Sequence, residues 1–283
     1  MCTLIVLHRV VAGAPLVIAA NRDEFYDRPS EGPAIRQTAG GAVLAPLDRR
    51  EGGTWLGVNA HGVFAALTNL RTEADPNPDR RSRGLLVLDA LEADCAAEAA
   101  NRVEELISGG RECHAARSSS QAEAGRYNPF NLVIADLERA FAITLSETFQ
   151  RIPLAPGAHV IGNVAPTERI PKLARIAGAA RAASRAPSDS VLDELAAICR
   201  DHGLASTEAA CVHVDDADPR YGTRSSILLR IGAAGITDAS RSELRYAEGA
   251  PCRTRYEDFT PLLRELGLEG QLIGGEPVAR SAS

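Results

Sequence analysis

The sequence has almost no lysine, few aromatic residues and no excess of positive charge. Lys172 is the single lysine, so the cationic charge is nearly all arginine, which indicates a compositional bias rather than a function. The formal net charge of -6 argues against a general nucleic-acid binder, because such proteins usually present a basic face. Aromatic residues amount to 4%, and no Cys-Pro or Cys-x-x-Cys-His motif occurs, so no fixed haem site can be assigned.

Cysteines are present but widely separated, without a Cys-x-x-Cys pair. This spacing argues against a zinc ribbon and against a disulfide framework, and it favours a reducing cytoplasm. No apolar run approaches the ~20 residues of a transmembrane helix, and the N-terminus lacks the basic segment and cleavage site of a signal peptide. We therefore expect a cytoplasmic protein with no stable membrane insertion and no nucleic-acid partner. The six cysteines are Cys2, Cys95, Cys113, Cys199, Cys211 and Cys252.

The length of the chain allows one domain or two. With 283 residues and 45% hydrophobic content, it can bury a substantial core. No Pro/Ser-rich linker divides the sequence, so we predict a single domain over residues 1–283, with a frayed tail from about residue 270. The oligomeric state is left open.

The most informative stretch is the N-terminus, where Cys2 follows the initiator methionine. A side chain this small permits removal of Met1, which would leave Cys2 with a free α-amino group. One residue would then supply both nucleophile and base. The amine has an ordinary pKa of about 7.7–8 and a thiol one of about 8.5, so the amine can accept the thiol proton near neutral pH.

The residues after Cys2 predict a β-hairpin that brings a charged segment beside the thiol. Thr3–Val10 and Leu16–Ala20 are apolar runs on either side of a turn at Ala12–Ala14. A turn centred there places Cys2 roughly opposite Asp23, because the start of the first strand meets the end of the second.

Arg22 and Asp23 have complementary roles in this arrangement. A guanidinium beside sulfur favours the thiolate, and a carboxylate beside the α-amine can hold and orient it. The alternative is structural: a cysteine early in an apolar strand is often a small buried hydrophobe, and Arg22 to Glu24 could form a solvated loop. Spacing alone leaves both alternatives open.

Further motifs follow in a specific order along nearly the whole chain. They are Met1-Cys2-Thr3, Ala20-Asn21-Arg22-Asp23-Glu24-Phe25-Tyr26-Asp27-Arg28-Pro29-Ser30, Glu51-Gly52-Gly53-Thr54-Trp55-Leu56-Gly57, Ala65-Ala66-Leu67-Thr68-Asn69, Arg81-Ser82-Arg83-Gly84, Tyr127-Asn128-Pro129-Phe130-Asn131-Leu132, Gly162-Asn163 and Tyr221-Gly222-Thr223-Arg224. Together they resemble the NRDE family, which includes the transport and Golgi organisation protein 2 group. The resemblance implies an N-terminal-nucleophile hydrolase-like fold, an α+β sandwich with four αββα layers, related to choloylglycine hydrolases and penicillin acylases.

The resemblance also implies roles for residues far from the N-terminus. By similarity to choloylglycine hydrolases, Asn69 and Asn163 at strand ends would donate their amides to an oxyanion. Arg224 would bind an anionic part of a substrate or tune the thiolate. The structural alternatives are a loop cap for Asn69 and a salt bridge for Arg224. In choloylglycine hydrolases the active-site Arg and Asp stand three apart, whereas Arg22 and Asp23 are adjacent here.

Four further residues are predicted to contact substrate. Asn21, Glu24 and Trp55 belong to the matching motifs, and Arg83 belongs to an arginine-rich segment before a predicted helix. Guanidiniums at a helix N-terminus could hold a carboxylate or phosphate of a ligand. Acidic residues in the same segment could neutralise them instead.

These observations favour a hydrolase that cleaves an amide, or else a thioester, of an unidentified small molecule. Cys2 would attack the carbonyl while its α-amine takes and returns the proton. One alternative is a non-catalytic carrier of haem or a lipid-like ligand on the same fold, and another is a scaffold. His213 lies near Asp215, Asp216 and Asp218, but such loops without a full ligand pattern are usually solvated, so we predict no metal and no cofactor.

Hydrophobic periodicity and turn residues predict the remaining elements. Gly and Pro predict a loop over Phe25–Gly40, and polar composition predicts irregular structure over Gly109–Arg126. Predicted strands cover Ala42–Ala45, Thr54–Val58, Val63–Leu67, Phe130–Ala135, Ala140–Leu145, His159–Asn163, Ala209–Val214, Ser225–Ile231 and Ile236–Tyr246. Predicted helices cover Gly84–Leu91, Asp94–Ile107, Lys172–Ser184, Val191–His202 and Pro261–Gly267.

Overall fold

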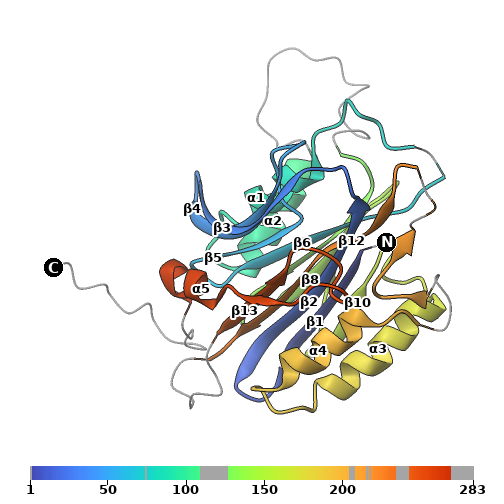
Figure 1. Ribbon diagram of the computed structural model, residues 1–283. Coiled ribbons are helices and arrows are strands. Elements are labelled where there is room, and N and C mark those ends of the chain that lie inside the picture. The colour runs from blue at the N-terminus through green and yellow to red at the C-terminus, as the bar shows by residue number, and fades with distance from the viewer. Residues whose placement is uncertain are drawn as a thin grey trace.

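The computed structural model has two β-sheets packed face to face, with helices on the outer face of each sheet (Figure 1). It describes residues 2–73, 75–108, 127–203, 208–214, 216, 218–233 and 242–268. The order of the layers is helix, sheet, sheet, helix. The predicted α+β sandwich with four αββα layers is therefore confirmed.

The first sheet contains the N-terminal hairpin. Its strands are β1 (Thr3–Val11), β2 (Ala14–Phe25), β10 (Gly157–Ile161), β11 (His213–Val214), β12 (Tyr221–Ile231), β13 (Glu243–Ala247) and β14 (Glu257–Asp258). They are ordered β10-β1-β2-β12-β13-β14, and β11 also pairs with β12. The hairpin thus lies inside the sheet, flanked by β10 and β12.

The second sheet runs in chain order. Its strands are β3 (Ser30–Thr38), β4 (Gly41–Asp48), β5 (Leu56–Asn59), β6 (Phe64–Asn69), β7 (Phe130–Ala135), β8 (Ala140–Leu145) and β9 (Phe149–Pro153). The helices are α1 (Arg83–Ala90), α2 (Ala96–Ser108), α3 (Pro171–Ala183), α4 (Val191–Arg200) and α5 (Thr260–Leu266). Helices α1 and α2 cover the second sheet, and α3 and α4 cover the first.

Three apolar layers hold these elements together. The central layer lies between the sheets, and each outer layer lies between a sheet and its helices. Leu4 and Val6 of β1 belong to the central layer, whereas Ile5 and Leu7 belong to the layer under α3 and α4. Because successive side chains of a strand point to opposite faces, both faces of β1 are buried. This explains the unbroken apolar run after Cys2.

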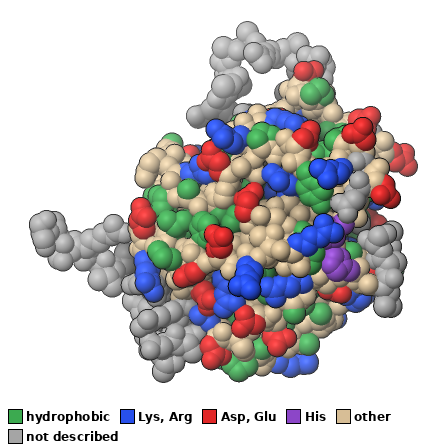
Figure 2. All heavy atoms as spheres, in the orientation of Figure 1, with side chains coloured by type: hydrophobic (Ala, Val, Ile, Leu, Met, Phe, Trp, Pro, Cys, Tyr) green, Lys and Arg blue, Asp and Glu red, His purple; other side chains and the backbone are tan. Residues whose placement is uncertain are grey.

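The surface is mixed in charge. On the face shown in Figure 2, basic and acidic side chains are interspersed. Nearly all of the basic ones are arginines, as the composition requires. No helix in the described ranges is long and apolar enough to cross a membrane.

Strand β3 shows that the loop predicted over Phe25–Gly40 is wrong. Ser30–Thr38 pairs with β4, and the pairing register shifts between Glu31 and Ala34. Pro33 lies inside this irregularity. A proline is tolerated there because β3 lies at the edge of the sheet. Proline has no N–H, and at an edge no neighbouring strand needs that hydrogen bond. The turn-forming residues mark an irregular edge strand rather than a loop.

Three other strands differ from the prediction. The sequence pattern predicts neither β9 nor β14, which are short strands at sheet edges. Of the strand predicted over Ala209–Val214, only His213 and Val214 pair as a strand, because the N–H groups of Ala210 and Cys211 bond to a carbonyl at the end of α4. Three predicted segments lie wholly or partly outside the described residues. They are the irregular segment 109–126, the tail from about residue 270, and the first part of the predicted strand 236–246, up to residue 241.

A close backbone contact sets the start of α1 against the second sheet. A Cβ atom added to Gly53 would lie 2.4 Å from the carbonyl carbon of Gly84. The N–H of Thr54 donates to the carbonyl of Gly84 at 3.1 Å. Only glycine fits at position 53, and this contact brings Arg83 and Trp55 to the same end of the sandwich.

We therefore expect Gly53→Ala to lower the free energy of unfolding by about 1–3 kcal/mol, because the methyl group would displace backbone rather than a flexible side chain. Gly178→Ala is the matched control. Gly178 is exposed in α3 with open space around it, so alanine should stabilise the protein by about 0.5–1 kcal/mol. Urea denaturation of both variants measures the two changes, and equal stability of Gly53→Ala and the original protein would contradict the prediction.

Candidate active site

Cys2 lies directly before β1, between the ends of two neighbouring strands. Extended to the start of the chain, the pairing register of β1 with β2 aligns Cys2 with Arg22. The register of β1 with β10 aligns it with Asn163. Two residues predicted to be catalytic therefore flank the cysteine.

The predicted alignment of Cys2 with Asp23 is wrong by one residue. The turn pairs as expected, but a bulge at Arg9 adds a residue to β1. Arg9 has a φ of 56°, and Pro15 across from the bulge has no N–H to give to the ladder. Beyond the bulge the partner of Cys2 moves by one position, from Asp23 to Arg22.

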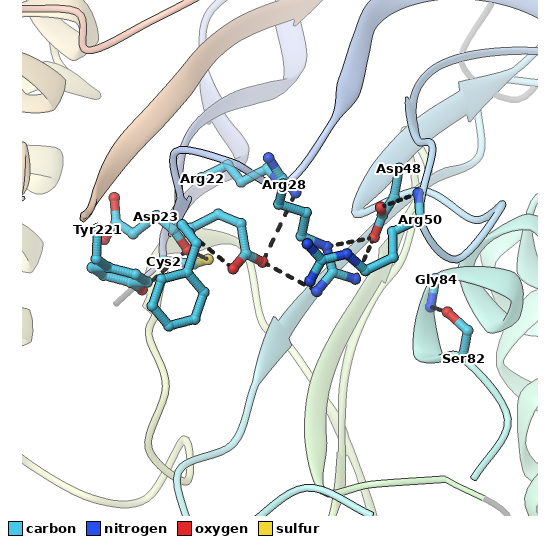
Figure 3. Close-up of polar contacts among 11 residues, drawn as sticks. Cys2, Arg22, Asp23, Arg28, Asp48, Arg50, Ser82, Gly84 and Tyr221 are labelled. Atoms are coloured by element: carbon cyan, nitrogen blue, oxygen red, sulfur yellow. Dashed lines mark hydrogen bonds and ion pairs between the residues drawn. The ribbon is translucent and has the colours of Figure 1, made fainter. Parts of the chain in front are cut away.

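Asp23 is nevertheless in contact with the thiol. Cys2 Sγ donates to the backbone oxygen of Asp23 at 3.7 Å, and the hydroxyl of Tyr221 donates to the same oxygen at 3.1 Å. The hydroxyl of Thr223 donates to Asp23 Oδ1 at 2.7 Å. Figure 3 shows Cys2, Asp23 and Tyr221 side by side. Strand β12 therefore fixes both the backbone and the carboxylate of Asp23.

The thiol and the carboxylate share a poorly solvated environment. Part of Cys2 is exposed, but its sulfur is surrounded by protein, and this burial raises the pKa of the Cys2 thiol, with the charge of Asp23 acting in the same direction. Burial also raises the pKa of Asp23, while the hydrogen bond from Thr223 opposes the change. A thiol with a raised pKa is a weak nucleophile at neutral pH, so it needs a base next to it.

Arg22 presents a guanidinium at the edge of this site. The side chain is 6% exposed and stacks on Trp55, with the guanidinium carbon 4.3 Å from the ring centroid. Glu24 lies 3.8 Å away as an ion-pair partner. Among the described residues, no acceptor bonds to Arg22 Nη1, although that nitrogen is buried. A buried donor of this kind is ready to bind an oxygen atom of a ligand.

An ion-pair network joins the site to the second sheet. Arg28 Nη2 lies 2.6 Å from Asp48 Oδ2, and Arg28 Nε donates to the same oxygen at 3.0 Å. Arg28 Nη1 also lies 3.8 Å from Glu24. Figure 3 shows these contacts running from the end of β2 to β4. Glu24 is thus held within the protein by two arginines.

Asn69 and Asn163, the two residues predicted to stabilise an oxyanion, lie next to each other, but they differ in hydrogen bonding and exposure. Asn163 Nδ2 donates to the backbone oxygen of Asn69 at 2.6 Å. The hydroxyl of Thr68 donates to the carbonyl of Gly162 at 2.6 Å, which joins the ends of β6 and β10. Asn69 is exposed at the end of β6. The side-chain amide of Asn163 is therefore bonded to backbone, whereas Asn69 is the exposed member of the pair.

The remaining predicted residues are placed differently from one another. Asn21 donates its amide to the carbonyls of Cys199 and Ala210 at 2.8 and 2.9 Å, so its side chain supports the structure. Arg83 donates to the carbonyl of Pro129 at 2.9 Å, and burial lowers its pKa, with the charges of Glu24 and Cys2 opposing that change. Arg83 therefore lies within electrostatic reach of the thiol.

Arg224 occupies a bulge in β12. Thr223 pairs with Asp23 and Ser225 pairs with Arg22, so Arg224 is the extra residue between them. Among the described residues, Arg224 makes no hydrogen bond or ion pair with Cys2, so the structure does not bring these two predicted residues into contact.

Three residues near the site do not follow from the sequence reasoning. Tyr221 and Thr223 both bond to Asp23, and they belong to the motif Tyr221-Gly222-Thr223-Arg224, in which the resemblance implies a role for Arg224 alone. Lys172, at the start of α3, is 3% exposed. Burial lowers the pKa of Lys172, while the charges of Asp23 and Cys2 oppose this change. Its signal in the sequence is that it is the single lysine.

A four-layer αββα sandwich is the fold of N-terminal-nucleophile hydrolases, and solved structures share this fold. A Caenorhabditis elegans ortholog of N-acylethanolamine-hydrolyzing acid amidase superposes with a TM-score of 0.54 at 12% identity, covering 84% of this chain and 95% of that one. A conjugated bile acid hydrolase from Clostridium perfringens gives 0.53 at 11% identity, covering 100% and 98%. At these identities the likeness establishes the fold.

Sequence comparison identifies the family. The profile for Transport and Golgi organisation 2 matches residues 1–240, and the chain belongs to this family. The Transport and Golgi organization protein 2 homolog of Homo sapiens is 28% identical over 277 residues, covering 87% of this chain and 92% of the relative. The homolog of Bos taurus is 29% identical over 261 residues, covering 81% and 87%. The family expected from the motifs is confirmed.

The charge of Asp23 leads to a prediction about thiol titration. Because this carboxylate raises the pKa of Cys2, Asp23→Asn should lower it, and the pH midpoint for alkylation of Cys2 by iodoacetamide should move to lower pH. Asparagine can still accept the bond from Thr223, so the local structure should persist. Peptide mapping by mass spectrometry measures the profile, with alkylation of the exposed Cys95 as the internal reference. A midpoint that moves upward would show that Asp23 does not act on the thiol through its charge.

Proposed function

We propose that this protein is an N-terminal-cysteine hydrolase that cleaves a C–N amide bond of a small molecule. The observation that carries the proposal is the contact of the Cys2 thiol with Asp23, at a point where the ends of β2, β6 and β10 meet. The fold is one on which amidases of known structure are built. A thioester is the second substrate class, since it would give the same acyl-enzyme.

The first half of the reaction forms the acyl-enzyme. Removal of Met1 would give Cys2 a free α-amine, which takes the proton of the thiol as sulfur attacks the substrate carbonyl. Asp23 holds this amine, and its own carboxylate is held by Thr223. The protonated amine then gives its proton to the leaving nitrogen, and the C–N bond breaks. The products of this step are a free amine and a thioester on Cys2.

The second half hydrolyses that thioester. The α-amine takes a proton from water, the resulting hydroxide attacks the acyl carbon, and the thiolate leaves and is reprotonated. The side-chain amide of Asn69 stabilises the oxyanion in both halves, and Asn163 fixes the backbone of Asn69. Nη1 of Arg22, which has no hydrogen-bond acceptor among the described residues, is available for a carbonyl or carboxylate oxygen of the substrate.

A cytoplasmic location is part of the proposal. The mechanism needs a reduced thiol, and the cysteines in the described part of the chain form no disulfide. The cytoplasm would keep Cys2 in that state.

The N-terminal cysteine can be tested by two variants. Intact mass of the purified protein should show that Met1 is absent. Cys2→Ala should retain less than roughly one thousandth of the turnover of a panel of fluorogenic acyl amides, because the nucleophile is gone. A leucine inserted between Met1 and Cys2 keeps the thiol but removes its free amine, and it should be equally inactive. Acyl-enzyme trapped as a mass adduct on Cys2 gives a readout independent of turnover.

Either of two results would remove the proposal. One is a Cys2→Ala variant that turns over its best substrate at the original rate. The other is a native protein that retains Met1 and is still active, since the α-amine would then be blocked.

Asn69→Ala tests the oxyanion role. We expect kcat to fall by about 10²–10³-fold with a small change in KM, because the amide acts on charge that develops in the transition state. Asn101→Ala, at an exposed position of α2, is the matched control and should leave both constants unchanged. A KM effect without a kcat effect would instead assign Asn69 to substrate binding.

A further inference from the structure

A second cluster of reactive side chains lies away from Cys2. His202 follows α4, Cys211 lies two residues before β11, His213 is the first residue of β11, and Cys252 lies in the turn after β13. One ligand atom from each of the four lies within 4.8 Å of the others. We propose that these side chains bind one zinc ion in a tetrahedral Cys2His2 site.

The distances between the donor atoms match such a site. Zn–S bonds of about 2.3 Å and Zn–N bonds of about 2.0–2.1 Å place donors of a tetrahedron about 3.8 Å apart for S–S and about 3.5 Å apart for S–N. Cys211 Sγ lies 3.5 Å from Cys252 Sγ and 3.6 Å from His213 Nε2, and Cys252 Sγ lies 3.2 Å from the same nitrogen. Three donors already stand at tetrahedral spacing.

His202 supplies the fourth donor. Its ring lies 5.3 Å from that of His213 between centroids, and the two planes are inclined by 31°. His202 is exposed, so its ring can turn toward the ion without displacing packed neighbours. Four protein ligands leave no open position, which is typical of a structural zinc site rather than a catalytic one.

The donor types favour zinc over harder cations. Two thiolates and two imidazoles are soft or intermediate ligands, whereas calcium and magnesium prefer oxygen. Binding displaces one proton from each thiol to solvent, and the two thiolates then balance the charge of Zn²⁺. The bound site is neutral overall, which suits Cys211 because that side chain is buried.

The backbone around the cluster is held in place by hydrogen bonds. The backbone carbonyl of Asp201 accepts hydrogen bonds from the N–H groups of Ala210 and Cys211 at 2.9 and 3.0 Å. The side-chain Oδ1 of Asp201 accepts a hydrogen bond from the N–H of Gly203 at 3.0 Å. These bonds join the loop carrying His202 to the segment carrying Cys211. The turn carrying Cys252 is fixed by Arg200 Nε, which donates to the carbonyl of Pro251 at 3.1 Å.

The cluster is also connected to the candidate active site. Between the two ligands Cys211 and His213, the N–H of Val212 donates to Thr223 Oγ1 at 2.8 Å. The same hydroxyl donates to the carboxylate of Asp23. An ion at the cluster would therefore fix the strand that holds Asp23 in position.

The test uses the full-length protein purified under reducing conditions. After treatment with a chelator and addition of Zn²⁺, desalting and mass-spectrometric metal analysis should give one zinc per chain. Co²⁺ should give the visible bands of a tetrahedral complex and a sulfur-to-cobalt charge-transfer band. Cys252→Ser should lose both signals, and His202→Ala should weaken zinc binding by at least about tenfold. Cys95→Ser, which changes an exposed cysteine elsewhere, should bind zinc normally.

Because Cys211 is buried, its variant could fail to fold, so the test depends on the less buried Cys252 and the exposed His202. Two results would overturn the proposal. One is absence of stoichiometric zinc in protein whose thiols are all reactive. The other is a Cys211–Cys252 disulfide found by peptide mapping, which would make the pair a redox site.

Discussion

The antiparallel pairing of β2 with β12 is the interaction on which the candidate site depends. It places Thr223 opposite Asp23, so that a hydroxyl meets a carboxylate that is 4% exposed. A buried carboxylate is costly unless it is hydrogen-bonded, and Thr223 and Tyr221 together fix its side chain and its backbone. The cysteine contributes little to this framework. It is held beside a carboxylate whose position is already set.

The electrostatics of the site explain why an internal base suits it. Burial works against ionisation of the thiol, and the carboxylate next to it works in the same direction. A thiolate would therefore be populated only when a nearby group accepts the proton at the moment of attack. The buried charge of Lys172 and the stacked guanidinium of Arg22 are positioned to limit the accumulated negative charge.

Local patterns predicted the N-terminal hairpin and most of the strands and helices, and the resemblance of the motifs predicted the four-layer sandwich, but neither predicted the contacts between distant segments. The hairpin followed from apolar strands around a glycine turn, whereas the hydrophobic pattern does not predict the bulge at Arg9, which lies across from Pro15. The sequence pattern did not predict edge strand β3, because glycine and proline, which are typical of turns, also occur in irregular strands at the edge of a sheet.

Long-range bonds account for the rest. The amide of Asn21 faces two carbonyls near α4 and β11, and Asn163 bonds to backbone from β6, which no spacing along the chain reveals. The His and Cys side chains of the second cluster span fifty positions in three segments. A rule that looks for two cysteines close in sequence does not detect such a set, because the topology of the sheet brings its members together.

The position of proline in the second sheet affects how the molecule behaves among its own copies. In the described part of the chain, β3 and β9 form the two edges of that sheet, with Pro33 in one and Pro153 at the end of the other. An exposed edge with a full row of N–H and C=O groups can template pairing with another chain, whereas proline and an irregular register interrupt that row. The residues that made β3 difficult to recognise therefore also protect the sandwich against edge-to-edge aggregation.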